Sequence, residues 1–253
     1  MTDAADRAVH VAGVGKTFGD GEAAVRALAD VEFAVRDGEF VCIVGPSGCG
    51  KTTLFRIIAG LEQPTEGAVL LDGDPVTGPG VDRGMVFQEY GLFPWLTVRE
   101  NVEFGLEQQD RPEADRRRRA RAMLDLVGLA GVEDTYPADL SGGMKQRVGI
   151  ARALAVDPEL LLMDEPFGSV DAQTRDMLHG ELLDIWDETG KTVLFVTHDV
   201  EEAVKLADRV VVMSNGPGSV REVVDVPLDR PRERTDEAFA ACRERVLDLI
   251  HER

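Results

Sequence analysis

The chain has 253 residues, which suits one large α/β domain or two small ones. It holds 47 acidic and 28 basic residues, and the formal net charge of −19 argues against a general nucleic-acid-binding surface. No stretch approaches ~18 uninterrupted apolar residues, so no membrane-spanning helix is predicted, and the polar, acidic beginning is unlike a secretory signal. Three scattered cysteines without metal-ligand spacing fit reduced cytosolic thiols: Cys42, Cys49 and Cys242.

The acidic composition has two interpretations. Only five of the 28 basic residues are lysine. One interpretation is an acidic face that binds a partner. We favour the other, an acidic, lysine-poor surface similar to that of halophilic proteins, because high salt screens the self-repulsion of such a charge. A protein of this kind is expected to lose stability on desalting.

The first predicted elements are two short β-strands. Val31, Phe33 and Val35 alternate with polar residues, which is typical of a half-buried strand. A turn at 36–38 then leads into the apolar run Phe40–Val44, which is short enough for a buried strand.

A phosphate-loop motif follows this second strand directly. Residues 45–53 match the pattern G-x-x-x-x-G-K-[ST] between a strand and a helix. The glycines leave backbone N–H groups open to phosphates, Lys51 can reach the β- and γ-phosphates, and the Thr52 hydroxyl can ligate Mg²⁺. Cys49 is interpreted as a spacer rather than a nucleophile. The chain is predicted to bind a nucleoside triphosphate through Gly45, Pro46, Ser47, Gly48, Cys49, Gly50, Lys51, Thr52 and Thr53.

Later segments alternate between strands and helices. Further strands are predicted at 67–71, 84–87, 160–163, 192–197, 209–213 and 220–224. Between Glu89 and Asp157 the chain is predicted to be helical, with one helix from Pro112 to about Val127 and another after residues 141–143. The arginines of the first helix are interpreted as a solvated face: Arg116, Arg117, Arg118, Arg119 and Arg121. Helical spacing of apolar residues predicts a C-terminal amphipathic helix containing Phe239, Cys242, Val246 and Leu249.

A pair of carboxylates follows a third apolar run. Residues 160–166 read Leu-Leu-Leu-Met-Asp-Glu-Pro, so a fully buried strand would deliver Asp164 to its end. We expect Asp164 to hold Mg²⁺ through water and Glu165 to accept a proton from the water that attacks the phosphate.

A second candidate anion site lies in residues 140–147, Leu-Ser-Gly-Gly-Met-Lys-Gln-Arg. Ser141, Gly142 and Gly143 would open a helix whose free N–H groups and dipole face outward. A chain that already holds one triphosphate gains little from a second anion site of its own. We therefore expect two chains to associate head to tail, each phosphate loop being closed by the partner's 141–143 segment.

The order of these motifs resembles that of the ATP-binding-cassette (ABC) family, over nearly the whole chain. The resemblance implies an α/β fold with a RecA-like P-loop NTPase core, an antiparallel β subdomain and a helical (signature) subdomain, with ATP and Mg²⁺ bound in a head-to-tail homodimer. The expected organisation is a single ABC ATPase domain over 1–253, with the core at about 1–88 and 158–225, the helical subdomain at about 89–157 and the C-terminal helix at about 235–250.

Further roles come only from this resemblance. Phe18 is similar to the aromatic residue that stacks on adenine, although a core phenylalanine remains an alternative. Gln88 is similar to the glutamine that senses Mg²⁺ and links to the membrane partner, and His198 to the histidine that contacts the γ-phosphate. Gln146 is placed with the nucleotide-binding signature and Asp171 with the contacts across the dimer. The family's usual Ala-Leu-Asp is Ser169-Val170-Asp171 here.

Residues 88–102 look most like the nitrate/sulfonate/taurine importer subfamily, as does the Pro- and Arg-rich tail 226–232. This resemblance implies a peripheral ATPase at the cytoplasmic face of the membrane, working with separate permease subunits and, indirectly, with an extracellular solute-binding protein. Phe93 and Trp95 would contact the permease, or else belong to the core. Nitrate, an alkanesulfonate, taurine or a thiamine precursor would be the solute, with sulfonate-like anions ranked first.

Two other functional classes remain as alternatives. A cassette acting on ribosomes or DNA usually carries two cassettes or long coiled-coil insertions, which this sequence lacks. A non-hydrolysing regulator is disfavoured because both Glu165 and His198 are present.

Overall fold

The computed structural model describes residues 7–168 and 170–251. The described residues fall into two compact units, one within Met1–Gly80 and Thr192–Arg253 and the other within Val81–Lys191. The fold is α/β with both parallel and antiparallel pairing, as the family resemblance implied. No described helix is long and apolar enough to cross a lipid bilayer.

The first unit contains an antiparallel sheet. Its strands lie in the order β2 (Val25–Arg36), β1 (Arg7–Phe18), β4 (Glu66–Leu71) and β5 (Asp74–Pro75). The predicted strand around Phe33 is the second half of β2, and the strand predicted at 67–71 is β4. Strand β1 was not predicted, yet it pairs with both β2 and β4 and buries Val9, Val11 and Val14 completely.

The same unit contains a second set of paired strands. They lie in the order β10 (Ser219–Asp225), β9 (Arg209–Ser214), β3 (Phe40–Val44) and β8 (Thr192–Val196). Strand β3 runs parallel to both of its neighbours, and every residue of β3 and β8 is buried. A parallel strand covered on both faces reads as a continuous apolar run, which is why these strands were recognisable in the sequence.

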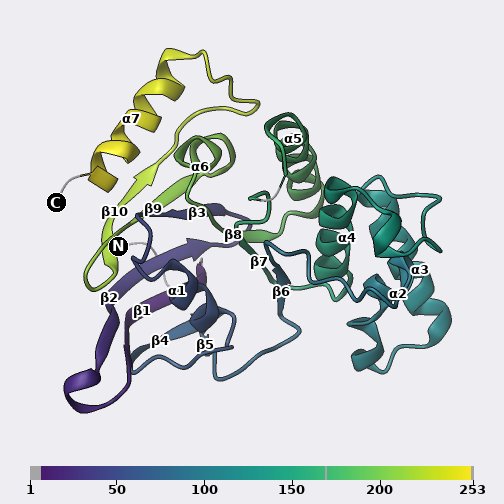
Figure 1. The fold of residues 1–253 in the computed structure, drawn as a ribbon, viewed down its shortest axis with the longest axis horizontal. Helices are drawn as coiled ribbons and strands as arrows, with labels where there is room; N and C mark the ends of the chain where they lie inside the picture. The colour runs from purple at the N-terminus through teal and green to yellow at the C-terminus, as the bar shows by residue number, and fades with distance from the viewer. Residues whose placement is uncertain (1–6, 169, 252–253) are drawn as a thin grey trace. The chain divides into compact units, whose positions relative to one another are not determined.

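The described part of the first unit contains three helices: α1 (Lys51–Ile58), α6 (Val200–Leu206) and α7 (Glu237–His251). A 3₁₀ turn, Gly21–Ala23, precedes β2. Helix α7 packs on α6, β9 and β10 (Figure 1), and it buries Phe239, Val246 and Leu249. The predicted apolar stripe is thus the packed face of α7, and Cys242 on the same stripe is half-buried.

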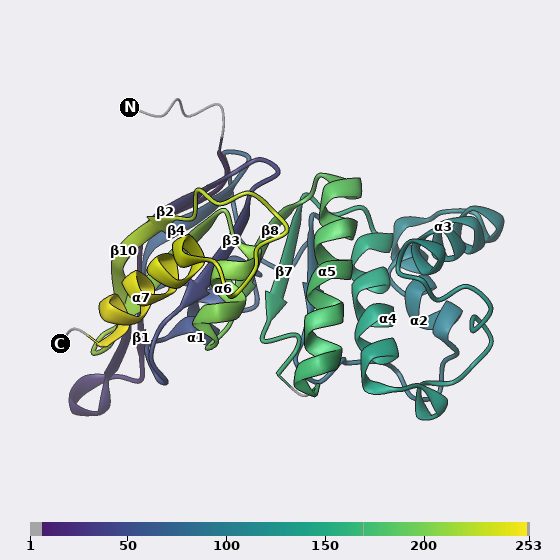
Figure 2. The ribbon, with the colours of Figure 1, turned by 90° about the horizontal axis from the view of Figure 1, so that it is seen from above.

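The second unit, as far as its residues are described, combines a parallel strand pair with four helices. The strands are β6 (Arg83–Val86) and β7 (Leu160–Asp164). The helices are α2 (Val98–Glu103), α3 (Glu113–Leu126), α4 (Gly142–Ala155) and α5 (Ala172–Thr189), with 3₁₀ turns at Leu106–Gln109 and Pro137–Asp139. Helices α2, α3 and α4 pack against one another, and α5 lies along the other side of α4 (Figure 2).

The boundaries of the two units differ from the expected subdomains. The expected core included residues 81–88 and 158–191, whereas the structure groups β6, β7 and α5 with the helical residues.

Candidate nucleotide site

The phosphate loop is built by the buried strand β3 and the start of α1. Strand β3 carries the chain to Gly45, and the first helical residue is Lys51. Gly48 and Gly50 have φ values of 81° and 92°, which favour glycine because an L side chain is strained there. Gly50 is the N-cap residue of α1, and no side chain caps this end. The first amides of α1 therefore have no side-chain cap, which suits the predicted contact with phosphates.

The turn between β9 and β10 packs against the phosphate loop through Gly218. Gly218 donates its N–H to the Ala27 carbonyl at 2.9 Å and accepts from the Ala29 N–H at 2.9 Å. A Cβ at Gly218 would lie 1.9 Å from the Cys49 carbonyl oxygen, so only glycine allows this approach. The sequence did not predict this role of Gly218, because nothing in the local sequence links it to a loop some 170 positions earlier.

Lys51 is held within the loop. Its Nζ donates to the Gly45 carbonyl at 2.7 Å and to the Pro46 carbonyl at 3.2 Å. The Cys49 thiol is completely buried, which agrees with its interpretation as a spacer. Thr52 is exposed at the first turn of α1. The loop thus combines a fixed ammonium group, open amides and an exposed hydroxyl group.

Phe18 lies at the end of β1 in the same unit. Its side chain is 42% exposed, so it is not the core residue that the alternative required. The Lys16 Nζ lies 4.9 Å from the centre of its ring. Lys16 is itself held by Glu62 at 2.6 Å and by the Gln63 carbonyl at 2.7 Å, and its hydrogen bond lowers the pKa of Glu62. The stacking of Phe18 on adenine stays a prediction.

His198 is exposed on a short connection between β8 and α6. Asp199 caps α6 by accepting from the N–H groups of Glu201 at 2.9 Å and Glu202 at 3.3 Å. The Thr197 hydroxyl donates to Glu202 and accepts from the Asp199 N–H at 3.0 Å. His198 therefore lies within a densely hydrogen-bonded turn.

The predicted carboxylate pair ends strand β7 in the second unit. Asp164 and Glu165 are both partly exposed. Glu165 has φ = 44°, which is uncommon for a residue with a side chain and often marks a functional site. The Gly168 N–H donates to the Glu165 carbonyl at 3.0 Å, and the Gln88 Nε2 lies 3.0 Å from the position a Cβ would take on Gly168. The structure thus brings Gln88 to the turn that follows Glu165.

The signature segment begins helix α4. Ser141 is exposed and its Oγ accepts from the Met144 N–H at 3.3 Å, so this helix has a side-chain cap. Gly142 and Gly143 are partly exposed in the first turn. The Gln146 side chain, by contrast, is completely buried. Its burial does not support the direct nucleotide contact expected from the resemblance.

Asp171 begins helix α5. Its carboxylate accepts from the Thr174 N–H at 3.0 Å and from the Thr174 hydroxyl at 2.7 Å, and these bonds lower its pKa. Asp171 is exposed, as a contact with another chain requires. The substitution Ser169 lies outside the described residues, whereas Val170 beside it is 9% exposed.

The residues expected to hold Mg²⁺ fit this ion by their chemistry. Thr52, Gln88 and Asp164 offer a hydroxyl, an amide and a carboxylate oxygen, and Mg²⁺ prefers hard oxygen ligands. Thr52 belongs to the first unit and the other two to the second. Across the described ranges, no group of three or more His, Cys, Asp or Glu side chains forms a metal site by itself. Few carboxylates are expected where substrate phosphates supply the remaining ligands.

A family model described as ABC transporter matches residues 28–168. The chain belongs to the ABC transporter family. The cassette is 47% identical over 253 residues to a nitrate import ATP-binding protein of Synechococcus elongatus, with 97% of this chain and 92% of that protein covered. It is 45% identical over 239 residues to an aliphatic sulfonates import ATP-binding protein of Bacillus cereus, with 94% of each covered.

The cassette also resembles a solved dimeric ATP-binding cassette in a post-hydrolysis state bound to ADP and phosphate. The TM-score is 0.75 at 36% identity, covering 87% of this chain and all of that one. The predicted family, its nitrate/sulfonate importer subfamily and the RecA-like fold are therefore confirmed, and the chain is an ATPase.

Proposed function

We propose that this cassette drives the uptake of a small oxyanion, such as a sulfonate, taurine or nitrate, through separate permease subunits. Its similarity to nitrate and aliphatic sulfonate import subunits supports the solute class. Two copies associate head to tail around two ATP molecules, and this arrangement is supported by the dimeric cassette it resembles. The pair works at the cytoplasmic face of the membrane, and a solute-binding protein delivers the solute outside. ATP binding closes the pair, and hydrolysis reopens it.

The residues divide the chemistry of hydrolysis among themselves. The open amides of α1 and the Lys51 ammonium bind the β- and γ-phosphates, because both present positive charge to the anion. Thr52, Asp164 and Gln88 would hold Mg²⁺, which would supply positive charge to neutralise the phosphates. Glu165 accepts the proton of the attacking water, and His198 orients the water and the γ-phosphate. The uncapped start of α1 after a buried strand is the observation that carries this assignment.

Glu165→Gln tests the hydrolytic step. The variant should bind ATP normally and lose about 10²–10⁴ in turnover, because an amide cannot accept the proton. It should also accumulate as a nucleotide-bound dimer, measured by light scattering with ATP. Glu107→Gln, an exposed acidic residue of the same unit, is the matched control. Normal turnover of Glu165→Gln as a monomer would refute the assignment.

The loop after β6 supplies the surface for the permease. Asn101 is completely buried, and its Nδ2 donates to the carbonyls of Phe93, Leu96 and Thr97 at 2.9–3.1 Å. Trp95 is nevertheless 70% exposed, with its ring 5.7 Å from that of Phe93. A large aromatic side chain on a fixed loop is typical of an interaction surface.

Trp95→Ala should therefore weaken co-purification with the permease and leave the ATP affinity of the isolated cassette unchanged. Tyr136→Ala, another exposed aromatic residue of the same unit, is the control. Equal recovery of the permease with wild type and Trp95→Ala would refute the docking surface.

The acidic surface is an adaptation to high salt. The net charge of −19 and the low lysine content support this proposal. Thermal melting between molar and low salt tests it, because removing the screening ions should lower the melting temperature. An unchanged melting temperature in low salt would exclude salt adaptation.

A further inference from the structure

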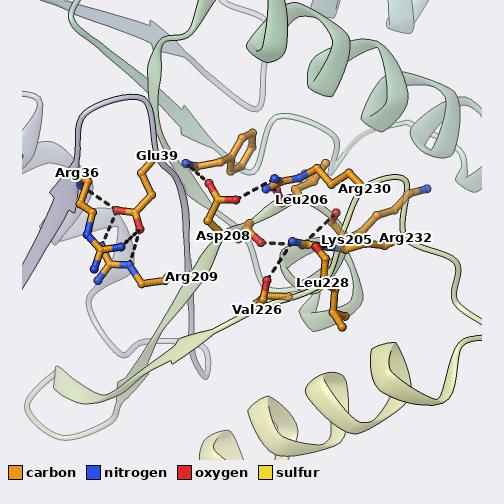
Figure 3. A network of polar contacts seen from close by, with 12 residues as sticks. Arg36, Glu39, Lys205, Leu206, Asp208, Arg209, Val226, Leu228, Arg230 and Arg232 are labelled. Atoms are coloured by element: carbon orange, nitrogen blue, oxygen red, sulfur yellow. Dashed lines mark hydrogen bonds and ion pairs between the residues drawn. The ribbon is translucent and has the colours of Figure 1, made fainter.

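The residues after β10 form a polar network that the nucleotide chemistry does not use (Figure 3). We propose that Arg232 is a positioning residue: it fixes the C-terminal end of α6 and thereby the orientation of His198 at the other end. This inference rests on the proposed role of His198 in ATP hydrolysis. It assigns a role in turnover to the Pro- and Arg-rich tail, which touches neither nucleotide nor permease in the proposed mechanism.

Arg232 binds backbone carbonyls from both α6 and the tail. Its Nη1 donates to the carbonyls of Val204 at 2.6 Å and Ala207 at 2.7 Å, at the end of α6. Its Nε donates to the Leu228 carbonyl at 3.0 Å, and its Nη2 to the Val226 carbonyl at 3.2 Å. The residue is only 6% exposed. The planar guanidinium thus joins two segments through donors that point in different directions.

The charge of Arg232 is stabilised by the helix end rather than by an ion pair. In the part of the chain that the structure describes, no carboxylate lies within salt-bridge distance of Arg232. The last carbonyls of a helix lack partners within the helix and carry partial negative charge, so a cation is favourable there. Burial, and secondly the neighbouring Arg230, lower the pKa of Arg232 to about 10. The side chain is therefore still protonated at neutral pH.

Arg230 extends the network to the strand that precedes the phosphate loop. Its Nη1 lies 2.8 Å from the Asp208 Oδ1, and its Nη2 donates to the Leu206 carbonyl at 2.5 Å. The second Asp208 oxygen accepts from the Phe40 N–H at 2.9 Å, at the first residue of β3. Figure 3 shows Asp208 between Arg230 and the residues around Arg209. The tail is thus tied to β3 at the end opposite to the phosphate loop.

The length of α6 explains why its C-terminal end matters to His198. The helix has seven residues, too few to be stable without tertiary support. Asp199 caps its beginning, and Arg232 binds carbonyls at its end. His198 directly precedes the N-terminal cap residue. If the C-terminal contacts are lost, the helix can tilt or fray, and the imidazole then loses its fixed direction.

The test compares Arg232→Ala, Arg232→Lys and a control, Arg245→Ala. Arg245 is exposed on α7 and pairs with Glu222 of β10 at 2.9 Å. Arg232→Ala should lower kcat on the order of 10–10²-fold, the range for a misplaced catalytic group, with the Kd for ATP within about twofold of wild type. Amide hydrogen exchange within 200–206 should become faster. Arg232→Lys should fold, keep the charge and recover only part of kcat, because an ammonium group lacks the fork.

A double variant with His198→Ala decides whether Arg232 acts through His198. Once His198 is absent, adding Arg232→Ala should not lower kcat further. The inference would be overturned if the kcat losses of the two single variants multiplied in the double variant. It would also be overturned by an unchanged kcat in both Arg232 variants, or by unchanged amide exchange of α6. These outcomes leave the proposed function intact as long as Glu165→Gln and His198→Ala are slow. If those two variants turn over normally, the proposed function fails and the inference with it. Faster amide exchange of α6 in Arg232→Ala would then show that Arg232 stabilises the helix without a role in turnover.

Discussion

Two helices in this cassette have glycine-rich N-termini, but the two N-termini are capped differently. Helix α1 begins after Gly50, which has a left-handed backbone and no side-chain cap. Helix α4 begins after Ser141, which has an extended backbone and caps the Met144 N–H with its own hydroxyl group. In the function we propose, the first end is an anion site that one chain completes, with Lys51 held inside the loop by the Gly45 carbonyl. At the N-terminus of α4, the Ser141 hydroxyl already accepts from one amide. This fits a segment that only adds contacts to a nucleotide held by the partner chain in the proposed dimer.

Lys51→Ala should disable phosphate binding at the N-terminus of α1. Because a charge-assisted hydrogen bond contributes about 1.5–3 kcal/mol, we expect ATP affinity to fall about 10–10²-fold and hydrolysis to stop. Isothermal titration with ATP measures this. Lys145→Ala, in the first turns of α4, is the control from the second end and should leave ATP binding by the monomer unchanged. Equal losses in both variants would remove the distinction between the two helix starts.

Ser141→Arg should disable only the N-terminus of α4, which we propose contacts the partner's nucleotide. The long cation would fill the exposed face that the partner's nucleotide approaches, so ATP-dependent dimer formation should be lost. ATP binding to the monomer should stay within about twofold, because a change below about 0.4 kcal/mol is expected where no phosphate contact is lost. Sedimentation with and without ATP measures the dimer. A Ser141→Arg protein that still dimerises would contradict the head-to-tail arrangement.

The sequence predicted the strands that are buried on both faces and missed elements that depend on their neighbours. Strands β3, β7 and β8 are continuous apolar runs, and their predicted ranges agree with the structure within about one residue. Strand β1 includes His10 and Lys16 among its apolar residues and is stabilised by pairing on both sides. Helix α5 presents a largely polar sequence and buries only a narrow set of residues: Leu178, His179, Leu182 and Ile185.

The same contrast applies to the candidate site. The phosphate loop, the carboxylate pair and the helix that begins after Ser141 were predictable because each is a short pattern with its own geometry. Gly218 and Arg232 were not, because each acts on backbone groups that are distant in sequence. Gln146 shows a third limit: a residue's place in a motif does not reveal which face of the helix is buried.

A smaller effect should distinguish the Ser141 cap from the carboxylate cap of α5. The hydrogen bonds from Thr174 lower the pKa of Asp171 in the folded protein, so this stabilisation is complete above the unfolded pKa of about 4 and is lost as pH falls through the folded value. Asp171→Ser should keep a side-chain cap on α5, but the free energy of unfolding should then depend less on pH in this acidic range. Ser141→Ala should lower stability by about 1 kcal/mol equally at pH 7 and pH 3, because a hydroxyl group does not titrate. Chemical unfolding of the nucleotide-free protein at both pH values checks this, and a pH-dependent loss in Ser141→Ala would contradict the separation of the two caps.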